Sequence, residues 1–309
     1  FLILETSTYP VIYRSENEKF FLDSRDGRKL LFPSLEDEWS VHLSVIVPAF
    51  DEALRLPPML DECMEFLEER RKKDKKFRYE IIVVSDGSRD DTVKVGLEYT
   101  KKFGPDVVRV LELEKNRGKG GAVRLGMMSS RGALLLFADA DGATQFSELS
   151  KLEQKMQQIT KHDYLKEPEL SSQSLGLVCG SRAHLEAAES AEVNRSVVRI
   201  MLMHAFHWLV ATTAVASIAD TQCGFKLLTR RSAQMCFGAL HIERWAFDVE
   251  LLYIAERLSI PLGEVPVNWT EMEGSKIVPV LSWLQMGKDL LLNWLRYKIG
   301  AWKIRQKES

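Results

Sequence analysis

The chain has 309 residues, of which 45% are hydrophobic and 28% charged, and its formal net charge is −2. This length accommodates one large domain or two small ones, and the near-neutral charge excludes a general electrostatic attraction to nucleic acid. No two cysteines have the CxxC spacing, which favours free thiols in a reducing compartment over a disulfide framework or a zinc site. The four cysteines are Cys63, Cys179, Cys223 and Cys236.

The chain opens with the four apolar residues FLIL. They are too few to cross a bilayer, because a spanning helix needs about 20 apolar residues. The segment 1–42 is therefore either the remnant of a removed membrane anchor or a minor surface segment, and the sequence leaves both interpretations open.

From residue 43 onward, short apolar runs alternate with segments of helical character. LSVIVP (43–48) is a predicted strand that stops at Pro48, and three more apolar runs follow it. These are YEIIVVSDGS (79–88), VVRVLEL (107–113) and ALLLF (133–137). Helices are predicted between the strands, the last over 120–132. Unbroken apolar strands alternating with helices indicate βαβ units and a parallel sheet covered on both faces.

Polar residues follow the predicted strands at the edge where such sheets bind their ligands, beyond the carboxyl ends of the strands. The first strand leads to Asp51 and Glu52, the second to Asp86, and the fourth to Asp139 and Asp141. The glycine-rich loop KNRGKGG follows the third strand. Any one of these ends could be an ordinary turn, but four of them on one edge predict a binding site.

The sequence DAD at 139–141 places two carboxylates two residues apart. On an extended segment, residues i and i+2 point to the same side, so Asp139 and Asp141 would repel each other unless a cation lay near them. Carboxylate oxygens are hard ligands that suit Mg²⁺ or Mn²⁺. The alternative is a turn at the end of a strand, where Asp and Gly are common.

The loop NRGKGGA (116–122) has neither the Walker spacing nor the G-x-G-x-x-G of dinucleotide-binding folds. Two interpretations stay open. The glycines could form a tight entry to the next helix, or they could let the backbone approach a nucleotide while Lys119 supplies positive charge.

Seven stretches, in this order, resemble the family 2 glycosyltransferases of the GT-A fold. They are LSVIVPAFDE, IIVVSDGSRDDT, NRGKGGAVRLG, FADADGAT, CGSRAHL, DTQCGFKLLTR and RWAFDVELLYIA. The resemblance extends over roughly residues 17–305. It implies an α/β nucleotide-diphospho-sugar transferase fold, with a mixed, mainly parallel sheet, helices on both faces and membrane-facing C-terminal helices. We divide the chain accordingly into an N-terminal segment (1–42), a catalytic domain (43–275) and an amphipathic membrane-interface region (276–309).

Within that family, the stretches DTQCGFK and VNWTEMEGSK and the C-terminal helix resemble enzymes that glucosylate a lipid phosphate. The resemblance implies inverting, metal-dependent transfer of glucose from UDP-glucose to dolichyl phosphate, as a glucose donor for lipid-linked oligosaccharide and N-glycan assembly. It also implies an endoplasmic reticulum membrane protein whose catalytic domain faces the cytosol. The alternatives are a mannosyltransferase that uses GDP-mannose and a non-catalytic nucleotide-sugar-binding protein. Whether the chain forms a homo-oligomer is left open.

The resemblance also assigns site residues. The predicted metal ligands for Mg²⁺ or Mn²⁺ are Asp139, Asp141 and Gln222. The predicted donor-binding residues are Pro48, Ala49, Glu52, Asp86, Lys119, Asp139 and Lys276. The predicted catalytic residues are Asp141, Asp248 and Arg182, and Arg195 and Arg199 are predicted to bind the acceptor. The chain departs from the family at Ser85, which replaces the first aspartate of the usual DDGS, so that Ser85 or Asp86 must recognise the base.

Asp248 stands where many inverting relatives carry a general base. A phosphate acceptor has a second pKa of about 6, so its attacking oxygen is already largely anionic at pH 7 and needs holding more than deprotonation. We therefore expect Asp248 to position the acceptor or a basic neighbour, the alternative being a helix N-cap.

Two apolar segments are expected near the lipid. Residues 200–219 carry no formal charge and are either an interfacial helix or a buried core helix. Residues 282–307 mix basic residues with aromatic ones, which suits headgroup depth, and Trp283, Trp294 and Trp302 are expected there.

Overall fold

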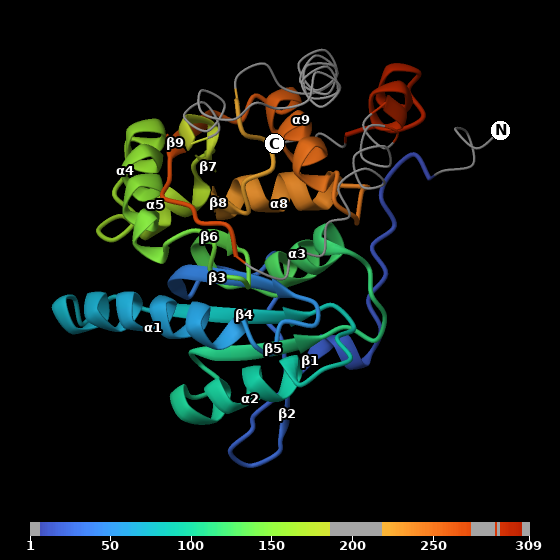
Figure 1. Cartoon of the computed structure of the whole chain (residues 1–309). Coiled ribbons are helices and arrows are strands. Elements are labelled where there is room, and N and C mark those ends of the chain that lie inside the picture. The colour runs from blue at the N-terminus through green and yellow to red at the C-terminus, as the bar shows by residue number, and fades with distance from the viewer. Residues whose placement is uncertain (1–6, 186–217, 273–287, 289–290, 305–309) are drawn as a thin grey trace, which may run out of the picture.

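The computed structural model describes residues 7–185, 218–272, 288 and 291–304. Its centre is a seven-stranded sheet with the order β5-β4-β3-β6-β8-β7-β9 (Figure 1). The strands are β3 (Val41–Ala49), β4 (Tyr79–Ser85), β5 (Val108–Glu112), β6 (Gly132–Ala138), β7 (Leu177–Ser181), β8 (Phe225–Thr229) and β9 (Leu262–Pro266). Among them, β8 alone runs antiparallel to its neighbours. The sheet is thus mixed and mainly parallel, as predicted.

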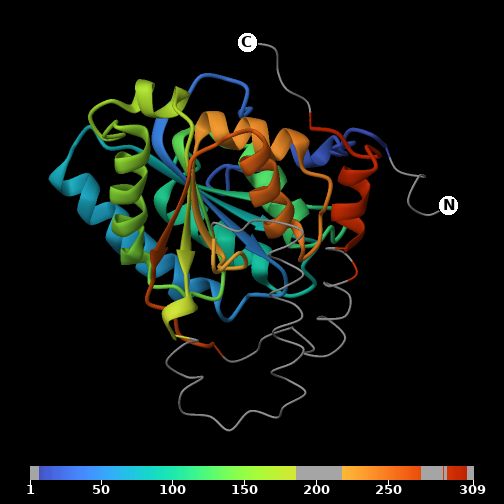
Figure 2. The ribbon, with the colours of Figure 1, turned by 90° about the horizontal axis from the view of Figure 1, so that it is seen from above.

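Helices pack on both faces of this sheet (Figure 2). The apolar residues of α1 (Leu56–Lys73), α2 (Thr92–Phe103) and α4 (Leu149–Thr160) pack with one face. Those of α3 (Lys119–Met128), α8 (Arg230–Ala239) and α9 (Phe247–Arg257) pack with the other. The short helix α5 (Pro168–Gln173) contacts β6 and α8. Two 3₁₀ turns, Asn17–Lys19 and Phe146–Glu148, directly precede β1 and α4.

Burial on two faces explains why the predicted strands read as unbroken apolar runs. Every residue of β4 and β6 is buried, since helices cover both sides of these central strands. The four strands predicted between residues 43 and 137 are confirmed within a few residues. The predicted helix over 120–132 ends earlier, at Met128, because the backbone turns at Ser129 and Ser130 toward β6.

The segment before β3 packs against the sheet domain. It forms a two-stranded antiparallel ribbon of β1 (Phe20–Leu22) and β2 (Lys29–Leu31), and β1 lies beside β5 (Figure 1). Phe21 and Phe32 belong to the same buried cluster as Leu111 of β5. Part of the predicted N-terminal segment is therefore built into the core.

The C-terminal residues 291–298 form a helix beside α9 (Figure 1). Trp302 is only 6% exposed and stacks on His241 at 4.2 Å between ring centroids. The expectation that Trp302 lies at lipid headgroups is wrong, because its ring faces the protein. Trp283 and most of 200–219 lie outside the described residues. Within the described residues, no helix is long and apolar enough to cross a membrane.

A fully buried carboxylate joins three elements at the amino edge of the sheet. Glu80 of β4 accepts hydrogen bonds from Ser44 Oγ at 2.6 Å, from Arg109 Nη1 at 2.9 Å, and from the backbone and side chain of Arg131. Burial lowers the pKa of Arg109, although Glu80 opposes that shift. The two charges are therefore interdependent.

We expect Glu80→Gln to lower the free energy of unfolding by about 3–5 kcal/mol, because it leaves the Arg109 charge buried without its counter-ion. The measurement is urea unfolding at neutral pH. The control is Glu16→Gln, which breaks the exposed pair with Lys19 and should change stability by less than about 0.5 kcal/mol. An equal loss of unfolding free energy in the two variants would contradict the role of Glu80 as the buried counter-ion of Arg109.

Candidate active site

The predicted acidic strand ends do meet at one edge of the sheet. Asp51 and Glu52 follow β3, Asp86 follows β4, and Asp139 and Asp141 follow β6. Because β8 is antiparallel, its preceding loop, which contains Gln222, reaches the same edge: the backbone N–H of Asp139 donates to Gly224 O at 3.1 Å.

Asp139 is held between a lysine and a glycine. Lys119 Nζ lies 2.6 Å from Asp139 Oδ1, and the Lys119 side chain is 14% exposed. Burial alone would lower the pKa of Lys119, but the charges of Asp139 and Asp248 outweigh burial and raise it. On the other side, a Cβ at Gly224 would overlap the Asp139 carboxylate. The packing of Asp139 thus requires glycine at 224.

Asp141 is partly buried close to a second carboxylate, that of Asp139. Burial and the charge of Asp139 raise its pKa, and the Ala143 N–H, which donates to Asp141 Oδ1 at 3.0 Å, opposes that shift. Arg55 Nη1 is 4.0 Å from Asp141 Oδ2, and the same guanidinium binds Glu52 through two nitrogens at 2.5 and 2.7 Å. Arg55 was not predicted from the sequence and links the β3 and β6 ends of the site.

This donor set suits a divalent cation that also binds phosphates. The described residues contain no cluster of three or more His, Cys, Asp or Glu side chains able to hold a metal alone. Mg²⁺ typically uses one or two carboxylates together with substrate phosphates, and Asp139 and Asp141 supply such a pair. Because its charged form is disfavoured, Asp141 would gain from a cation beside it. Gln222 is half-buried on the neighbouring loop.

On the other side of the edge, Asp86 is held by the loop after β5. The backbone N–H groups of Arg117 and Gly118 donate to its two carboxylate oxygens at 2.7 and 2.8 Å. Burial raises the pKa of Asp86 to about 6, and these N–H groups oppose the shift. The neighbouring Ser85 hydroxyl is buried without a hydrogen-bond partner in the described structure. Ala49 is buried and Pro48 half-buried beside them.

Arg182, at the end of β7, binds Asp220. Its Nε and Nη2 donate to the two Asp220 oxygens at 2.7 and 3.0 Å, and its guanidinium lies 5.4 Å from the centroid of the Trp269 ring. Burial would raise the pKa of Asp220, but Arg182 outweighs burial and lowers it. The other three predicted cations, Lys276, Arg195 and Arg199, lie outside the described residues.

Asp248 forms a buried ion pair with Lys226. The sequence predicted a basic neighbour for Asp248 but did not identify which residue it is. Lys226 Nζ lies 2.6 Å from Asp248 Oδ1, with side chains 0% and 4% exposed. Asp248 is in the first turn of α9 and Ala246 is the N-cap, so the N-cap alternative is wrong. Burial would lower the pKa of Lys226, but Asp248 outweighs burial and raises it. The one sequence signal for Lys226 was a charged residue within an apolar strand.

The comparisons with known proteins agree with this architecture. Residues 44–166 match the family described as glycosyl transferase family 2. A crystal structure of glucosyl-3-phosphoglycerate synthase from Mycobacterium tuberculosis, in complex with Mg²⁺ and uridine-diphosphate, has a TM-score of 0.52 at 15% identity. That alignment covers 83% of this chain and 79% of the other. At this low identity the similarity shows the fold alone. Fold and family match together define a family 2 glycosyltransferase of GT-A-like fold.

Curated relatives narrow the class. A dolichyl-phosphate beta-glucosyltransferase of Drosophila melanogaster is 55% identical over 98% of this chain and 90% of its own length. The Homo sapiens protein of the same name is 52% identical over 96% and 88%. The chain belongs to the dolichyl-phosphate beta-glucosyltransferase family.

We expect Gly224→Ala to lower kcat/KM by about 100-fold. The added methyl group displaces the Asp139 carboxylate, and even a small displacement of an active-site group lowers the rate of the reaction strongly. Turnover of the purified variant and its thermal unfolding are measured together. The control is Gly238→Ala in α8, where a Cβ meets nothing within 4 Å and alanine favours the helix. Unchanged kcat/KM in Gly224→Ala would refute the role of this contact.

Proposed function

We propose that this protein transfers glucose from UDP-glucose to dolichyl phosphate and releases UDP and dolichyl β-D-glucosyl phosphate, with inversion at the anomeric carbon. The observation that carries the proposal is the convergence of Asp139, Asp141 and Lys119 at the carboxyl edge of the sheet. The relatives named for this reaction align with the chain over nearly their whole length, which supports the same conclusion. The close relatives favour glucose over the mannose alternative.

On this proposal, the nucleoside of the donor lies against Pro48, Ala49, Glu52 and Asp86. The buried, unpartnered Ser85 hydroxyl supports a polar contact to the base at the position where the family usually has aspartate. The orientation of Asp86 supports the same placement, because two backbone N–H groups fix its carboxylate in one direction.

The diphosphate of the donor is placed beside Asp139 and Asp141. These carboxylates, with Gln222, would hold Mg²⁺ or Mn²⁺, which when bound stabilises the negative charge of the departing UDP as a Lewis acid. Lys119 and Arg55 carry positive charge next to the same carboxylates. They would bind and orient the diphosphate oxygens as the bond to the sugar breaks.

The acceptor is a phosphate monoester, which is largely a dianion at pH 7. One of its oxygens attacks the anomeric carbon while the bond from that carbon to the UDP oxygen breaks. We assign Arg182 to this phosphate, together with Arg195 and Arg199, which lie outside the described residues. Lys276, which also lies outside them, stays assigned to the donor. Since Arg182 is already bound to Asp220 by two nitrogens, its contribution would be a preoriented charge rather than a mobile clamp.

Asp248 is assigned a positioning role. A general base must reach the proton that it removes, whereas Asp248 is 3% exposed and its carboxylate binds Lys226. Lys226 Nζ also donates to Cys223 O at 2.7 Å. The pair therefore connects α9 to the loop that carries Gln222 and Gly224, and so supports the metal side of the site.

We further propose that the enzyme works at the endoplasmic reticulum membrane, with its catalytic domain in the cytosol. The acceptor named by the relatives carries a long lipid chain, so the phosphate must be reached at the membrane surface. Residues 200–219 and the region 276–309 are the proposed contacts with that surface. In the described part of the latter region, Leu291 in the helix 291–298 and Ile299 just after it are about half exposed, which supports a lipid-facing side for this part of the chain.

The proposal predicts turnover of dolichyl phosphate with UDP-glucose and none above background with GDP-mannose. Asp141→Asn should cut that turnover by about 100-fold or more, because it removes charge opposite the leaving diphosphate, and EDTA should act similarly. A radiolabelled-donor assay measures both. Calorimetric binding of UDP-glucose without turnover would favour a non-catalytic binding protein, and full activity of Asp141→Asn or in EDTA would overturn the metal assignment.

Asp248→Asn should lower the rate while the acid limb of the pH profile still follows ionisation of the phosphate acceptor near pH 6. The variant leaves Lys226 buried and unpaired, so the double variant Asp248→Asn/Lys226→Met, which removes both charges, controls for lost stability. If Asp248→Asn abolished turnover at neutral pH, and activity returned steeply at higher pH, Asp248 would be a general base after all.

A further inference from the structure

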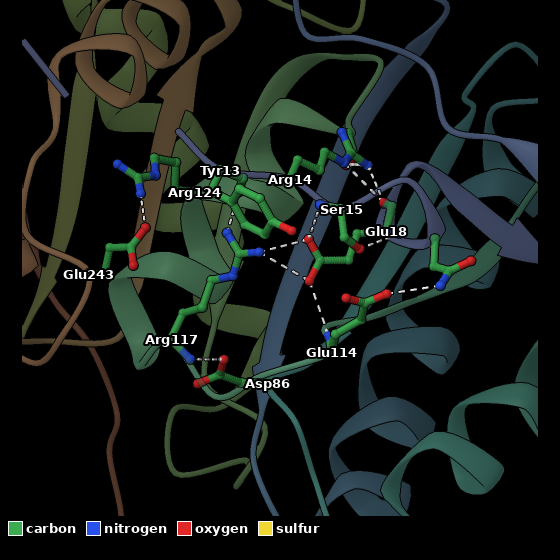
Figure 3. Close-up of polar contacts among 11 residues, drawn as sticks. Tyr13, Arg14, Ser15, Glu18, Asp86, Glu114, Arg117, Arg124 and Glu243 are labelled. Carbon is green, nitrogen blue, oxygen red and sulfur yellow. Dashed lines mark hydrogen bonds and ion pairs between the residues drawn. The ribbon is translucent and has the colours of Figure 1, made fainter. Parts of the chain in front are cut away.

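A fully buried carboxylate from the N-terminal segment lies beside the loop that holds Asp86 (Figure 3). Glu18 accepts hydrogen bonds from the backbone N–H of Ser15 at 3.0 Å and of Glu114 at 3.1 Å. It also accepts two from Arg117 Nη2, at 2.8 and 3.1 Å. Four hydrogen bonds from three residues thus converge on one carboxylate.

Arg117 connects this carboxylate to the candidate donor site. Its side chain, 10% exposed, binds Glu18 and donates to the backbone carbonyl of Tyr13, while its own backbone N–H donates to Asp86 Oδ1. Figure 3 shows Arg117 between Glu18 on one side and Asp86 on the other. Any displacement of the Arg117 backbone would therefore move a donor to Asp86.

The opposite side of the same loop is closed by backbone packing. Gly118 has φ +86°, and a Cβ there would lie 2.9 Å from Glu243 O. The Gly121 N–H donates to Glu243 O at 2.8 Å, and Arg124 pairs with the Glu243 side chain. With this side fixed, the contact between Glu18 and Arg117 holds the loop against Asp86 together with the Asn116 side chain, which donates to Asp86 O at 3.0 Å.

Burying a carboxylate and a guanidinium costs desolvation that apolar residues would avoid, so such a pair is weak evidence for a role in stability alone. It does provide a defined geometry, because a guanidinium binds a carboxylate along fixed directions. The charge of Arg117 also opposes the protonation of Asp86. Both effects act on the residue that we assign to the donor nucleoside.

We propose that Glu18 and Arg117 are positioning residues for donor binding, which hold the 114–118 loop so that the Arg117 and Gly118 N–H groups orient Asp86. The inference rests on the proposed function of Asp86. It makes the segment Tyr13–Glu18, which lies outside the matched family region of 44–166, a component of the UDP-glucose site.

The test is Glu18→Gln, which preserves the size of the side chain but removes its charge and one of its two acceptor oxygens. We expect KM for UDP-glucose to rise about tenfold, with kcat and KM for dolichyl phosphate changed less than about twofold, because a donor-binding interaction is lost and the chemical step is not. Arg117→Lys retains a charge but only one point of contact, and should raise KM for UDP-glucose less than Arg117→Met does.

The matched control is Arg14→Ala. Arg14 holds the same segment, through Glu18 O at 2.8 and 3.0 Å and Ser129 Oγ at 2.8 Å, but no described hydrogen bond joins it to Arg117. We expect it to lower the melting temperature without changing KM for UDP-glucose. If Arg14→Ala raised this KM as much as Glu18→Gln does, or if Glu18→Gln left it unchanged, the positioning role would be refuted.

Asp86→Asn separates this inference from the proposed function. If Asp86→Asn leaves KM for UDP-glucose unchanged, the assignment of Asp86 to the donor fails, and the inference fails with it. If Asp86→Asn raises KM but Glu18→Gln does not, the positioning inference alone is wrong. Should Glu18→Gln not fold, the order of KM among the wild type, Arg117→Lys and Arg117→Met decides, and equal KM values for the three would overturn it.

Discussion

Charge balance at the carboxyl edge of the sheet is the constraint on which this structure depends. Carboxylates follow several parallel strands there, and in a partly desolvated place each needs a cation or N–H groups. Three ion pairs provide this balance: Lys119 with Asp139, Arg182 with Asp220, and Lys226 with Asp248. Most of these partners come from a different element, so the site forms only when the sheet and its covering helices have assembled.

The same arrangement suits the proposed reaction, which brings two highly charged phosphate groups to this edge. Lysine and arginine side chains already oriented by carboxylates need little reorganisation to bind phosphate oxygens. Gly224 is part of this arrangement, because without a side chain it lets the backbone before β8 lie directly against Asp139. The substrate site thus follows from how the acidic strand ends are neutralised.

Sequence reasoning was accurate where the pattern was local. The strands around Val45 and Ile82 were recognised from apolar runs, and Asp139 and Asp141 were correctly expected just after the end of a strand. It was inaccurate for Trp302, since an aromatic and basic helix end looks the same whether its rings face lipid or, as here, stack on His241. It also missed Arg55, whose i,i+3 pairing with Glu52 resembles an ordinary surface contact.

The sequence by itself determined the alternation of strands and helices, the order of the motifs and the family, because hydrophobic period and short motifs are properties of neighbouring residues. Only the tertiary structure decided which charges meet. Lys226 and Asp248 are 22 positions apart, and Glu18 and Arg117 are 99 apart. No local pattern encodes such pairs, since they depend on how whole elements pack and on which buried groups then lack a partner.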